Sequence, residues 1–458
     1  MADRKTPAAA PPAEGFRRAD QILDALRRRR AEPGADCASE CQAIHFEHDE
    51  IAERLRRSER EHGGVGFELL FAGTDVDTPE PWKSLPLDQT IERLKTAKAR
   101  VARDVIVLVH HYQNEAVYSF GDFGGDSFLL ARKAASQPDR RYIVFCGVHF
   151  MAETARVVCH PDQVVILPSL GAGCSMADMA KPEDAEDAFD ALRSLARPGR
   201  TVIPITYMNS EAALKALCGR NGGVVFTSSN AETAFRWALA RSGDVQLLCT
   251  PDEYLGRNVA RRLGIRDDEM VTWNWMGHPP LGGCPREALA AARVVLWRGL
   301  CHVHDMFEPR HVELFAERLP RATFLLHPEV RPAVVEEAGR QARAGAIAEV
   351  RLGSTEAIKK WIEQGNPGDV FVVATEWNLV NRLALDHPDR RVVFMADVLC
   401  KCSTMNRITP RGLLWTLETI ERKLRGEEVA LPNVIDVPMD VRRDANVALQ
   451  RMLDLPPG

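Results

Sequence analysis

Short apolar runs alternate with longer amphipathic segments along most of this chain. Val105–Val109 is one such run, and similar runs recur toward the C-terminus. Runs of about four to eight apolar residues, rich in β-branched side chains, are typical of strands buried on both faces of a parallel sheet. The predicted strands span residues 105–109, 142–145, 164–168, 201–205, 224–226, 245–249, 323–326, 350–352 and 369–373.

Helices are predicted after most of these strands, from the spacing of their apolar residues. Residues 88–103 form a predicted helix before the first strand, and residues 410–425 form another after a capping Thr409. Strand–helix alternation predicts an α/β fold of parallel sheets with right-handed crossovers. Residues 16–61, rich in Arg and Glu, predict a charged helical extension, and the proline-bearing tail from Leu431 is expected to wrap the surface.

Polar side chains directly follow several predicted strands. His110 and Tyr112 follow the first strand, and His327 and Glu329 follow the strand at 323–326. Ligands of open parallel sheets bind beyond the carboxyl ends of the strands, so these positions predict a binding site. The other strand-end candidates are Tyr207, Asn209, Ser228, Ser354 and Thr355.

Hydroxyl groups also stand where three predicted helices begin, at Ser127, Ser228 and Ser354–Thr355. Helix N-termini attract anions, so the pattern favours a small ligand with carboxylate or phosphate groups. An N-cap role explains each serine by itself, and the two roles are compatible. Tyr112 and Glu329 are candidate proton-transfer groups, whereas a single strand-end histidine can equally be structural.

Three cysteines, Cys174, Cys301 and Cys402, each follow an apolar run near the end of a strand–helix block. A [4Fe–4S] cluster normally takes four thiolates, so three would leave one iron open to act as a Lewis acid. The residues by themselves also allow three unrelated thiols, or a zinc site with a fourth ligand. Candidates for that ligand are His302, His304 and Cys400.

The composition is that of a globular protein without a nucleic-acid or membrane surface. The chain has 458 residues, a length that suggests about two to four domains. Charged residues make up 27% of the chain, and the formal net charge is −5. No apolar run reaches the roughly 18 residues of a membrane span, and the N-terminus lacks a signal-peptide core, so a cytoplasmic location is expected. Eleven cysteines without an export signal argue against a disulfide framework.

At these residues the chain resembles the quinolinate synthase family, bacterial enzymes that make the pyridine-ring precursor of NAD. The resemblance covers residues 88–421 and leaves 1–87 uncovered. The matching motifs are His110-x-Tyr112-Gln113, Gly125-Asp126-Ser127, Phe150-x-x-Glu153-Thr154, Ala172-Gly173-Cys174, Tyr207-x-Asn209, Thr227-Ser228-Ser229-Asn230, Gly299-x-Cys301-x-x-His304, His327-Pro328-Glu329, Gly353-Ser354-Thr355, Thr375-Glu376 and Cys402-x-x-Met405.

The resemblance implies three similar αβα sandwich domains with short parallel sheets around a pseudo-threefold axis, plus the helical N-terminal extension. The expected boundaries are 1–87 for a partly disordered, helical extension, 88–184 for the first domain with Cys174, 185–309 for the second with Cys301, 310–405 for the third with Cys402, and 406–458 for a C-terminal helix and tail.

The resemblance also implies a reaction, in which iminoaspartate condenses with dihydroxyacetone phosphate to give quinolinate, phosphate and water. Cys174, Cys301 and Cys402 are implied to hold a [4Fe–4S] cluster whose open iron acts as a Lewis acid. Tyr112 and Glu329 resemble the acid–base pair, with His110 and His327 beside them. The implied substrate-binding residues are His110, Ser127, Tyr207, Asn209, Ser228, His327, Glu329, Ser354 and Thr355.

An L-aspartate oxidase that forms iminoaspartate is a candidate partner. Cys400 competes with Cys402 as third ligand, and Cys402 is favoured because Met405 follows it at the family's spacing. Two alternative functions stay open. One is an iron–sulfur hydro-lyase acting on another hydroxy-acid, and the other is a non-catalytic, metal-stabilised sensor or binding protein.

Overall fold

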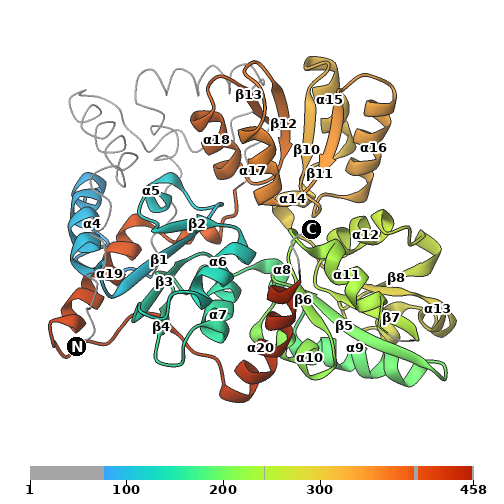
Figure 1. The fold of residues 1–458 in the computed structure, drawn as a ribbon, viewed down its shortest axis with the longest axis horizontal. Coiled ribbons are helices and arrows are strands. Elements are labelled where there is room, and N and C mark those ends of the chain that lie inside the picture. The colour runs from blue at the N-terminus through green and yellow to red at the C-terminus, as the bar shows by residue number, and fades with distance from the viewer. Residues whose placement is uncertain (1–76, 242, 397–400, 456–458) are drawn as a thin grey trace, which may run out of the picture.

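The structure is a computed structural model that describes residues 77–241, 243–396 and 401–455. The predicted helical extension at 16–61 and Cys400 lie outside the described residues. The described chain contains three β-sheets, which lie around the middle of the molecule with helices packed on them (Figure 1). The α/β class predicted from the alternating pattern is confirmed.

The first sheet has the strand order β14-β4-β3-β1-β2. Strands β1 (Val105–His110), β3 (Tyr142–Cys146) and β4 (Val164–Ile166) confirm three predicted strands. The short strand β2 (Phe123–Gly125) was not expected, because its glycines predict a loop; it pairs with the end of β1. The helices of this part are α4 (Leu87–Val101), α5 (Glu115–Tyr118), α6 (Ser127–Ala135), α7 (His149–Val158) and α8 (Ser175–Asp178).

The second sheet is entirely parallel, with the order β6-β5-β7-β9-β8. Its strands are β5 (Arg200–Tyr207), β6 (Val224–Phe226), β7 (Asp244–Thr250), β8 (Met270–Trp273) and β9 (Val294–Trp297). Its helices are α9 (Pro182–Leu195), α10 (Ala212–Arg220), α11 (Ala231–Leu239), α12 (Glu253–Arg262), α13 (Arg286–Ala291) and α14 (His302–Asp305).

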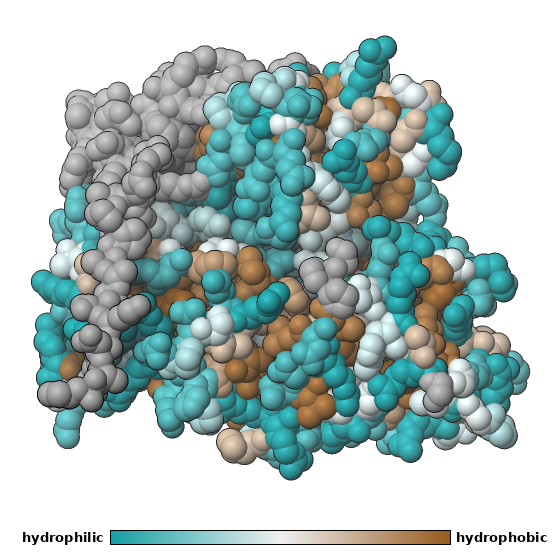
Figure 2. All heavy atoms as spheres, viewed as in Figure 1, coloured by the Kyte–Doolittle hydropathy of each residue, from teal (hydrophilic) through white to brown (hydrophobic). Residues whose placement is uncertain are grey.

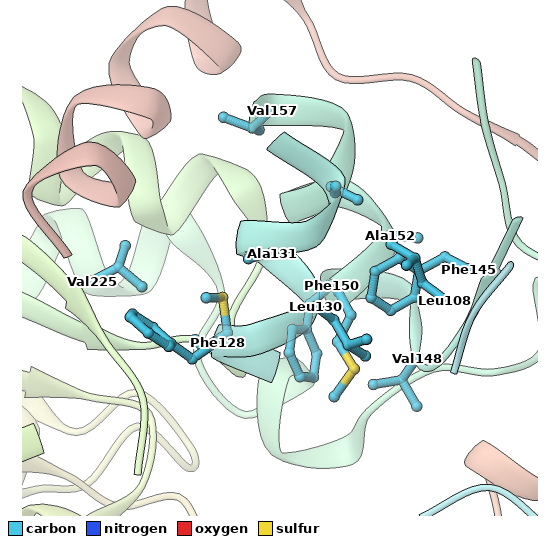
Figure 3. Packing of buried hydrophobic residues seen from close by; sticks show 14 of the residues in the cluster. Leu108, Phe128, Leu130, Ala131, Phe145, Val148, Phe150, Ala152, Val157 and Val225 are labelled. Carbon is cyan, nitrogen blue, oxygen red and sulfur yellow. The ribbon is translucent and has the colours of Figure 1, made fainter. Parts of the chain in front are cut away.

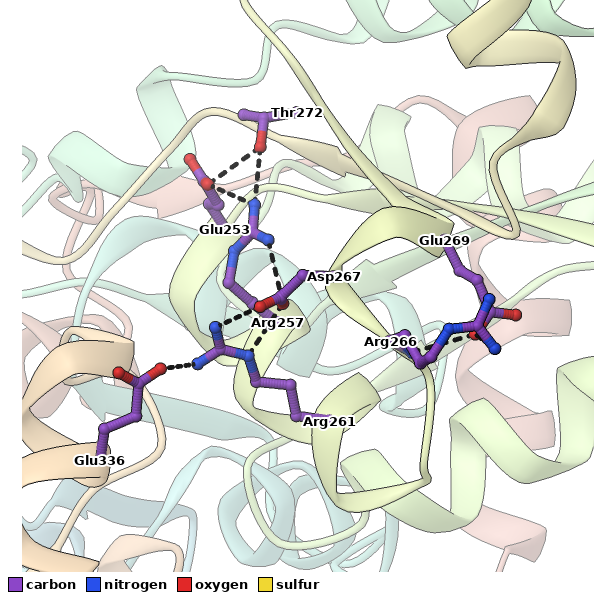
Figure 4. Close-up of polar contacts among 8 residues, drawn as sticks. All are labelled: Glu253, Arg257, Arg261, Arg266, Asp267, Glu269, Thr272 and Glu336. Atoms are coloured by element: carbon purple, nitrogen blue, oxygen red, sulfur yellow. Dashed lines mark hydrogen bonds and ion pairs between the residues drawn. The ribbon is translucent and has the colours of Figure 1, made fainter. Parts of the chain in front are cut away.

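The third sheet is also parallel and has the order β11-β10-β12-β13. Its strands are β10 (Thr323–Leu326), β11 (Glu349–Leu352), β12 (Val370–Ala374) and β13 (Arg391–Phe394), and its helices are α15 (Pro309–Arg318), α16 (Pro332–Arg343), α17 (Thr355–Glu363) and α18 (Trp377–Asp386). On the surface, Arg261 of α12 pairs with Asp267 and also with Glu336 of α16, which links the second sheet to the third (Figure 4).

The C-terminal segment returns to the first two sheets. Helix α19 (Pro410–Leu424) packs on α4, and β14 (Val434–Ile435) adds an antiparallel edge to β4. The prolines of this segment predict a tail that wraps the surface. After β14 the structure instead has a helix, α20 (Met439–Asp454). This helix packs closely on α10, because Gly219 has no side chain where the Asp444 carbonyl approaches.

Buried apolar side chains form one core shared by the first and second sheets, a separate core in the third sheet, and a smaller one between the second sheet and α9. In Figure 3, Phe128 of α6 points toward Val225 of β6, which joins the first sheet to the second. On the face seen in Figure 2, polar side chains cover much of the coloured surface, with apolar patches between them. Within the described part, no helix has both the length and the apolar character needed to cross a bilayer.

Candidate active site

A cavity of about 60 Å³ lies where the carboxyl ends of strands from the three sheets meet. Cys174, Cys301 and Cys402 all line it, although more than 100 residues separate each from the next. The volume has room for several water molecules. The other predicted site residues in its wall are His110, Tyr112, Ser127, Tyr207, Asn209, Ser228, His327, Glu329 and Thr355.

Ser354 is the one predicted site residue that does not line this cavity. It lines a neighbouring hollow of about 270 Å³, which shares Ser228 with the first. Ser354 is the N-cap of α17, and its hydroxyl accepts a hydrogen bond from the Ala357 N–H at 3.2 Å. The N-cap interpretation therefore holds for Ser354.

The other two helix-start serines are not N-caps. Asp126 caps α6, so the Ser127 side chain is left to face the cavity. Ser228 lies two residues before Asn230, which precedes α11. Both serines therefore line the cavity without capping a helix, and a ligand-binding role for them stays a prediction.

Each cysteine is presented by a short turn. Cys174 and Cys301 directly precede the one-turn helices α8 and α14. Burial, with a smaller contribution from Cys402, raises the pKa of the Cys174 thiol to about 12. Burial, Glu329 and the two other cysteines raise the pKa of Cys301. The three sulfur atoms are therefore close enough to interact electrostatically.

This donor set fits a thiolate-bound metal centre. Three converging thiols that oppose one another's ionisation become stable thiolates when a cation joins them. A second possible metal-binding group overlaps this set, since ligand atoms of Cys301, His304 and Glu329 lie within 4.8 Å of one another.

Glu329 is the centre of a buried polar cluster. Its Oε1 accepts a hydrogen bond from the Tyr207 hydroxyl at 2.6 Å, and its Oε2 lies 2.7 Å from His304 Nδ1. The rings of His304 and His327 stack with centroids 4.4 Å apart. Burial opposes ionisation of Glu329, but the contacts with His304 and Tyr207 outweigh it and lower its pKa to about 2. Glu329 is therefore a carboxylate at neutral pH.

Tyr112 reaches the cavity from the end of β1. Its hydroxyl lies 3.1 Å from Thr355 Oγ1 and 2.9 Å from Thr375 Oγ1. Burial and the Glu329 charge raise its pKa well above the usual value, so it remains a neutral hydroxyl. Burial also lowers the pKa values of His110 and His327 to about 3, so both imidazoles are neutral near pH 7.

Buried contacts hold the two strand-end loops in place. Arg382 of α18 donates to the carbonyls of His111 and Gln113, on either side of Tyr112. Asn258 of α12 donates to the carbonyls of Pro328 and Val330, on either side of Glu329. Each loop is therefore fixed by a helix from another sheet.

Among the described residues in the cavity wall, none is Lys or Arg. Asn209 has a buried side-chain oxygen that meets no hydrogen-bond donor among the described residues. Neutral hydroxyl, imidazole and amide groups are therefore the polar contacts that the wall offers to a ligand, beside the Glu329 and Asp126 carboxyls.

His304 and Thr375 belong to the cluster but not to the predicted acid–base set. His304 Nε2 lies 3.1 Å from Thr375 Oγ1, so the two residues connect Glu329 with Tyr112. Both residues stand in motifs that match the family, and this match was the only sign in the sequence that they belong to the site. Their roles could not be assigned because the contacts join residues that are far apart in the sequence.

The fold and this cavity together define a class of protein, an α/β enzyme in which three cysteines converge on a cavity that Tyr112 and Glu329 also line. A family model described as Quinolinate synthetase A protein matches residues 89–454. The chain belongs to this family.

Individual relatives agree. A quinolinate synthase from Nocardioides sp. is 46% identical over 371 residues, which cover 80% of this chain and 89% of the relative. Quinolinate synthases from Acidobacterium capsulatum and Bacillus cereus are each 42% identical, over 84% and 82% of this chain and 98% and 96% of the relatives. The family predicted from the motifs is confirmed.

Proposed function

We propose that this protein is a quinolinate synthase that condenses iminoaspartate with dihydroxyacetone phosphate to give quinolinate, phosphate and water in NAD biosynthesis. The observation that carries the proposal is the convergence of Cys174, Cys301 and Cys402 on one cavity with the Tyr112 and Glu329 side chains. Family membership supports the same activity.

The proposed cofactor is a [4Fe–4S] cluster bound by these three cysteines, with one open iron. When bound, the cluster supplies a Lewis-acidic iron that polarises a substrate oxygen. Cys402 is the proposed third ligand, because it lines the cavity with the other two. Cys400 lies outside the described residues.

The substrates carry carboxylate and phosphate groups, and neutral donors are proposed to bind them. Ser127, Ser228 and Thr355 offer hydroxyls, and Asn209 offers an amide. Ser354 is proposed to act from the adjoining hollow, at the start of α17. His110 and His327 are neutral near pH 7 and can donate or accept hydrogen bonds without adding charge.

Tyr112 and Glu329 are the proposed acid–base pair. Tyr112 keeps its proton to high pH and is suited to donate it to a leaving oxygen. Both oxygens of the Glu329 carboxylate are held by Tyr207 and His304, so Glu329 acts together with these two partners. Tyr207 itself lines the cavity, so its hydroxyl, bonded to Glu329, can connect the Glu329 carboxylate with a substrate.

The proposed domain organisation assigns one sheet and one cysteine to each of three domains, at 88–184, 185–309 and 310–405, around a pseudo-threefold axis. The three sheets support this division, as does the separate hydrophobic core of the third. A cytoplasmic location and an L-aspartate oxidase partner stay predictions; a source of iminoaspartate is required by the proposed reaction.

An anaerobic assay tests the proposal. Anaerobically purified protein should contain roughly four irons per chain and form quinolinate from iminoaspartate and dihydroxyacetone phosphate. Cys174→Ser should lose iron and activity, whereas Cys284→Ser should keep both, because Cys284 is a partly buried free thiol away from the cavity. Zinc in place of iron, or a bound cluster without quinolinate formation, would overturn the proposal and favour the sensor or hydro-lyase alternatives.

A further inference from the structure

One helical turn brings a second set of metal-binding side chains together beside the three cysteines. Cys301 is the N-cap of α14 and His304 lies three residues later, so the turn makes their side chains neighbours. Glu329 approaches both from the loop after β10. One ligand atom of each residue lies within 4.8 Å of those of the other two. A thiol, an imidazole and a carboxylate from two sheets therefore meet at one point.

The contact between His304 and Glu329 is short but is not aligned as a hydrogen bond. His304 Nδ1 lies 2.7 Å from Glu329 Oε2, yet this nitrogen has no hydrogen-bond partner among the described residues. The two side chains are only 1% and 3% exposed, so bulk water does not reach the nitrogen. Nitrogen and oxygen ligands of one zinc ion lie about 3 Å apart, close to the separation seen here. This arrangement suits two donors that share one cation better than a hydrogen bond between them.

Further contacts hold the two side chains and leave these atoms available. His304 Nε2 lies 3.1 Å from Thr375 Oγ1, and Glu329 Oε1 accepts a hydrogen bond from the Tyr207 hydroxyl at 2.6 Å. Metal-binding histidines are usually oriented in this way, through the ring nitrogen that does not bind the metal. The remaining atoms, Nδ1 and Oε2, are the pair that lies 2.7 Å apart.

We propose that the cluster-free chain binds one zinc ion through Cys301 Sγ, His304 Nδ1 and Glu329 Oε2. Zinc is the favoured ion because it accepts sulfur, nitrogen and oxygen ligands together, and three protein ligands leave its fourth position open. Cys301 and Glu329 line the cavity, so the fourth position is left to water there. On binding, the Cys301 S–H bond breaks, its proton passes to solvent, and the sulfur bonds the zinc.

Zinc and the proposed cluster exclude each other, because both require the Cys301 thiolate. Cluster-free protein that has taken up zinc should therefore accept no cluster until the zinc is removed. The ion also ties α14 to the loop after β10, which belongs to another sheet, so it should stabilise the folded chain. The inference goes beyond the proposed function and does not require quinolinate to be formed.

The test uses full-length protein freed of its cluster and kept reduced under anaerobic conditions. Zinc is titrated against a chromophoric chelator, and about one ion per chain should bind. Cys301→Ser and His304→Ala should each weaken binding by more than about 100-fold, since loss of an outer contact alone costs roughly 10- to 100-fold. Glu329→Gln should weaken it by more than about tenfold. Cobalt(II) in place of zinc should give a sulfur-to-cobalt absorption band that Cys301→Ser lacks.

Cys174→Ser and Cys402→Ser are the matched controls. Both cysteines face the same cavity as Cys301, so a site made of three thiols would lose zinc in each variant, whereas the proposed site should keep its affinity within about threefold. His110→Ala is the histidine control, because His110 is also buried in the cavity wall. Zinc should raise the melting temperature of wild type and of these controls, but not that of His304→Ala. His304→Gln replaces the alanine variant if that variant does not fold.

Reconstitution tests the exclusion. Zinc-loaded wild type should take up iron and sulfide only after a chelator has removed the zinc. The inference is overturned if cluster-free wild type binds no zinc, if Cys174→Ser or Cys402→Ser weakens binding as much as Cys301→Ser, or if His304→Ala and Glu329→Gln bind zinc as tightly as wild type. Cluster uptake unaffected by bound zinc would also overturn it. These measurements involve no substrate, so a failure of cluster-loaded protein to form quinolinate counts against the proposed function alone.

Discussion

Arg382→Met should destabilise the protein strongly, because the Arg382 guanidinium joins the third sheet to the loop that carries Tyr112. Its Nε donates to Glu115 Oε2 at 2.7 Å, and its two terminal nitrogens donate to the carbonyls of His111 and Gln113 at 2.9 and 2.8 Å. The guanidinium carbon also lies 3.6 Å from the centre of the Tyr118 ring.

The magnitude follows from burial. Arg382 and Glu115 are 4% and 5% exposed, so solvent does little to screen the pair. Removing one partner of a buried ion pair costs about 3–5 kcal/mol, because the other charge stays buried without its counter-ion. Methionine keeps most of the aliphatic stem, so lost packing adds little to this figure.

The assay is urea unfolding followed by circular dichroism, with quinolinate formation measured in parallel. Arg382→Met should lower the unfolding midpoint and reduce activity, since the loop around Tyr112 loses two of its anchors. The double variant Arg382→Met/Glu115→Gln should recover part of the stability, because glutamine removes the stranded charge. Arg340→Met is the control; Arg340 pairs with Glu337 on the exposed face of α16, and no measurable shift is expected.

Two results would refute this reasoning. An unchanged midpoint for Arg382→Met would show that the ion pair contributes nothing to stability. A double variant no more stable than the single one would show that the buried Glu115 charge is not the source of the loss.

Three further predictions concern packing, pH and catalysis. Gly219→Ala should lower the melting temperature, since the Cβ of the new alanine would lie 1.9 Å from the Asp444 carbonyl oxygen. The control is Gly339→Ala in α16, where the added Cβ meets only the end of a flexible arginine; this variant should be neutral or slightly stabilising. Burial lowers the pKa of Lys215 from 10.5 to about 8. Between these pH values the unfolded chain binds one proton more than the folded chain, so stability rises with pH by about 3 kcal/mol in total. Lys215→Met should remove this rise, which is measured by comparing the urea midpoints of variant and wild type from about pH 7 to 10.5. Tyr112→Phe should lower kcat by about 100-fold or more with full iron content, and wild-type turnover by this variant would remove Tyr112 from the acid–base pair.

The predicted strands were correct where apolar runs are long and β-branched, as in β1 and β5. Such strands are buried on both faces, so the local pattern already carries the information. Strand β8 was missed because its middle residues are only partly buried and its pattern is less regular. Helix α20 was missed because it follows a proline-bearing stretch and buries mainly small and scattered apolar residues against α10.

The sequence by itself determined the α/β class, most of the strands, the family, and which cysteines and strand-end side chains were candidates for a site. These features depend on local patterns, in which each residue's type and its neighbours decide the outcome. The sequence identified Ser127, Ser228 and Ser354 as candidates. It could not show that Ser354 caps a helix whereas the other two serines line the cavity.

Tertiary structure decided which candidates meet. Cys174, Cys301 and Cys402 converge because three separately formed sheets direct their strand ends toward one cavity, and no local pattern encodes that packing. The contacts of His304 with Glu329 and with Thr375 arise in the same way, from segments that approach only when the sheets pack together. Hydrogen-bond partners depend on positions within a few tenths of an ångström, and only the folded chain sets them.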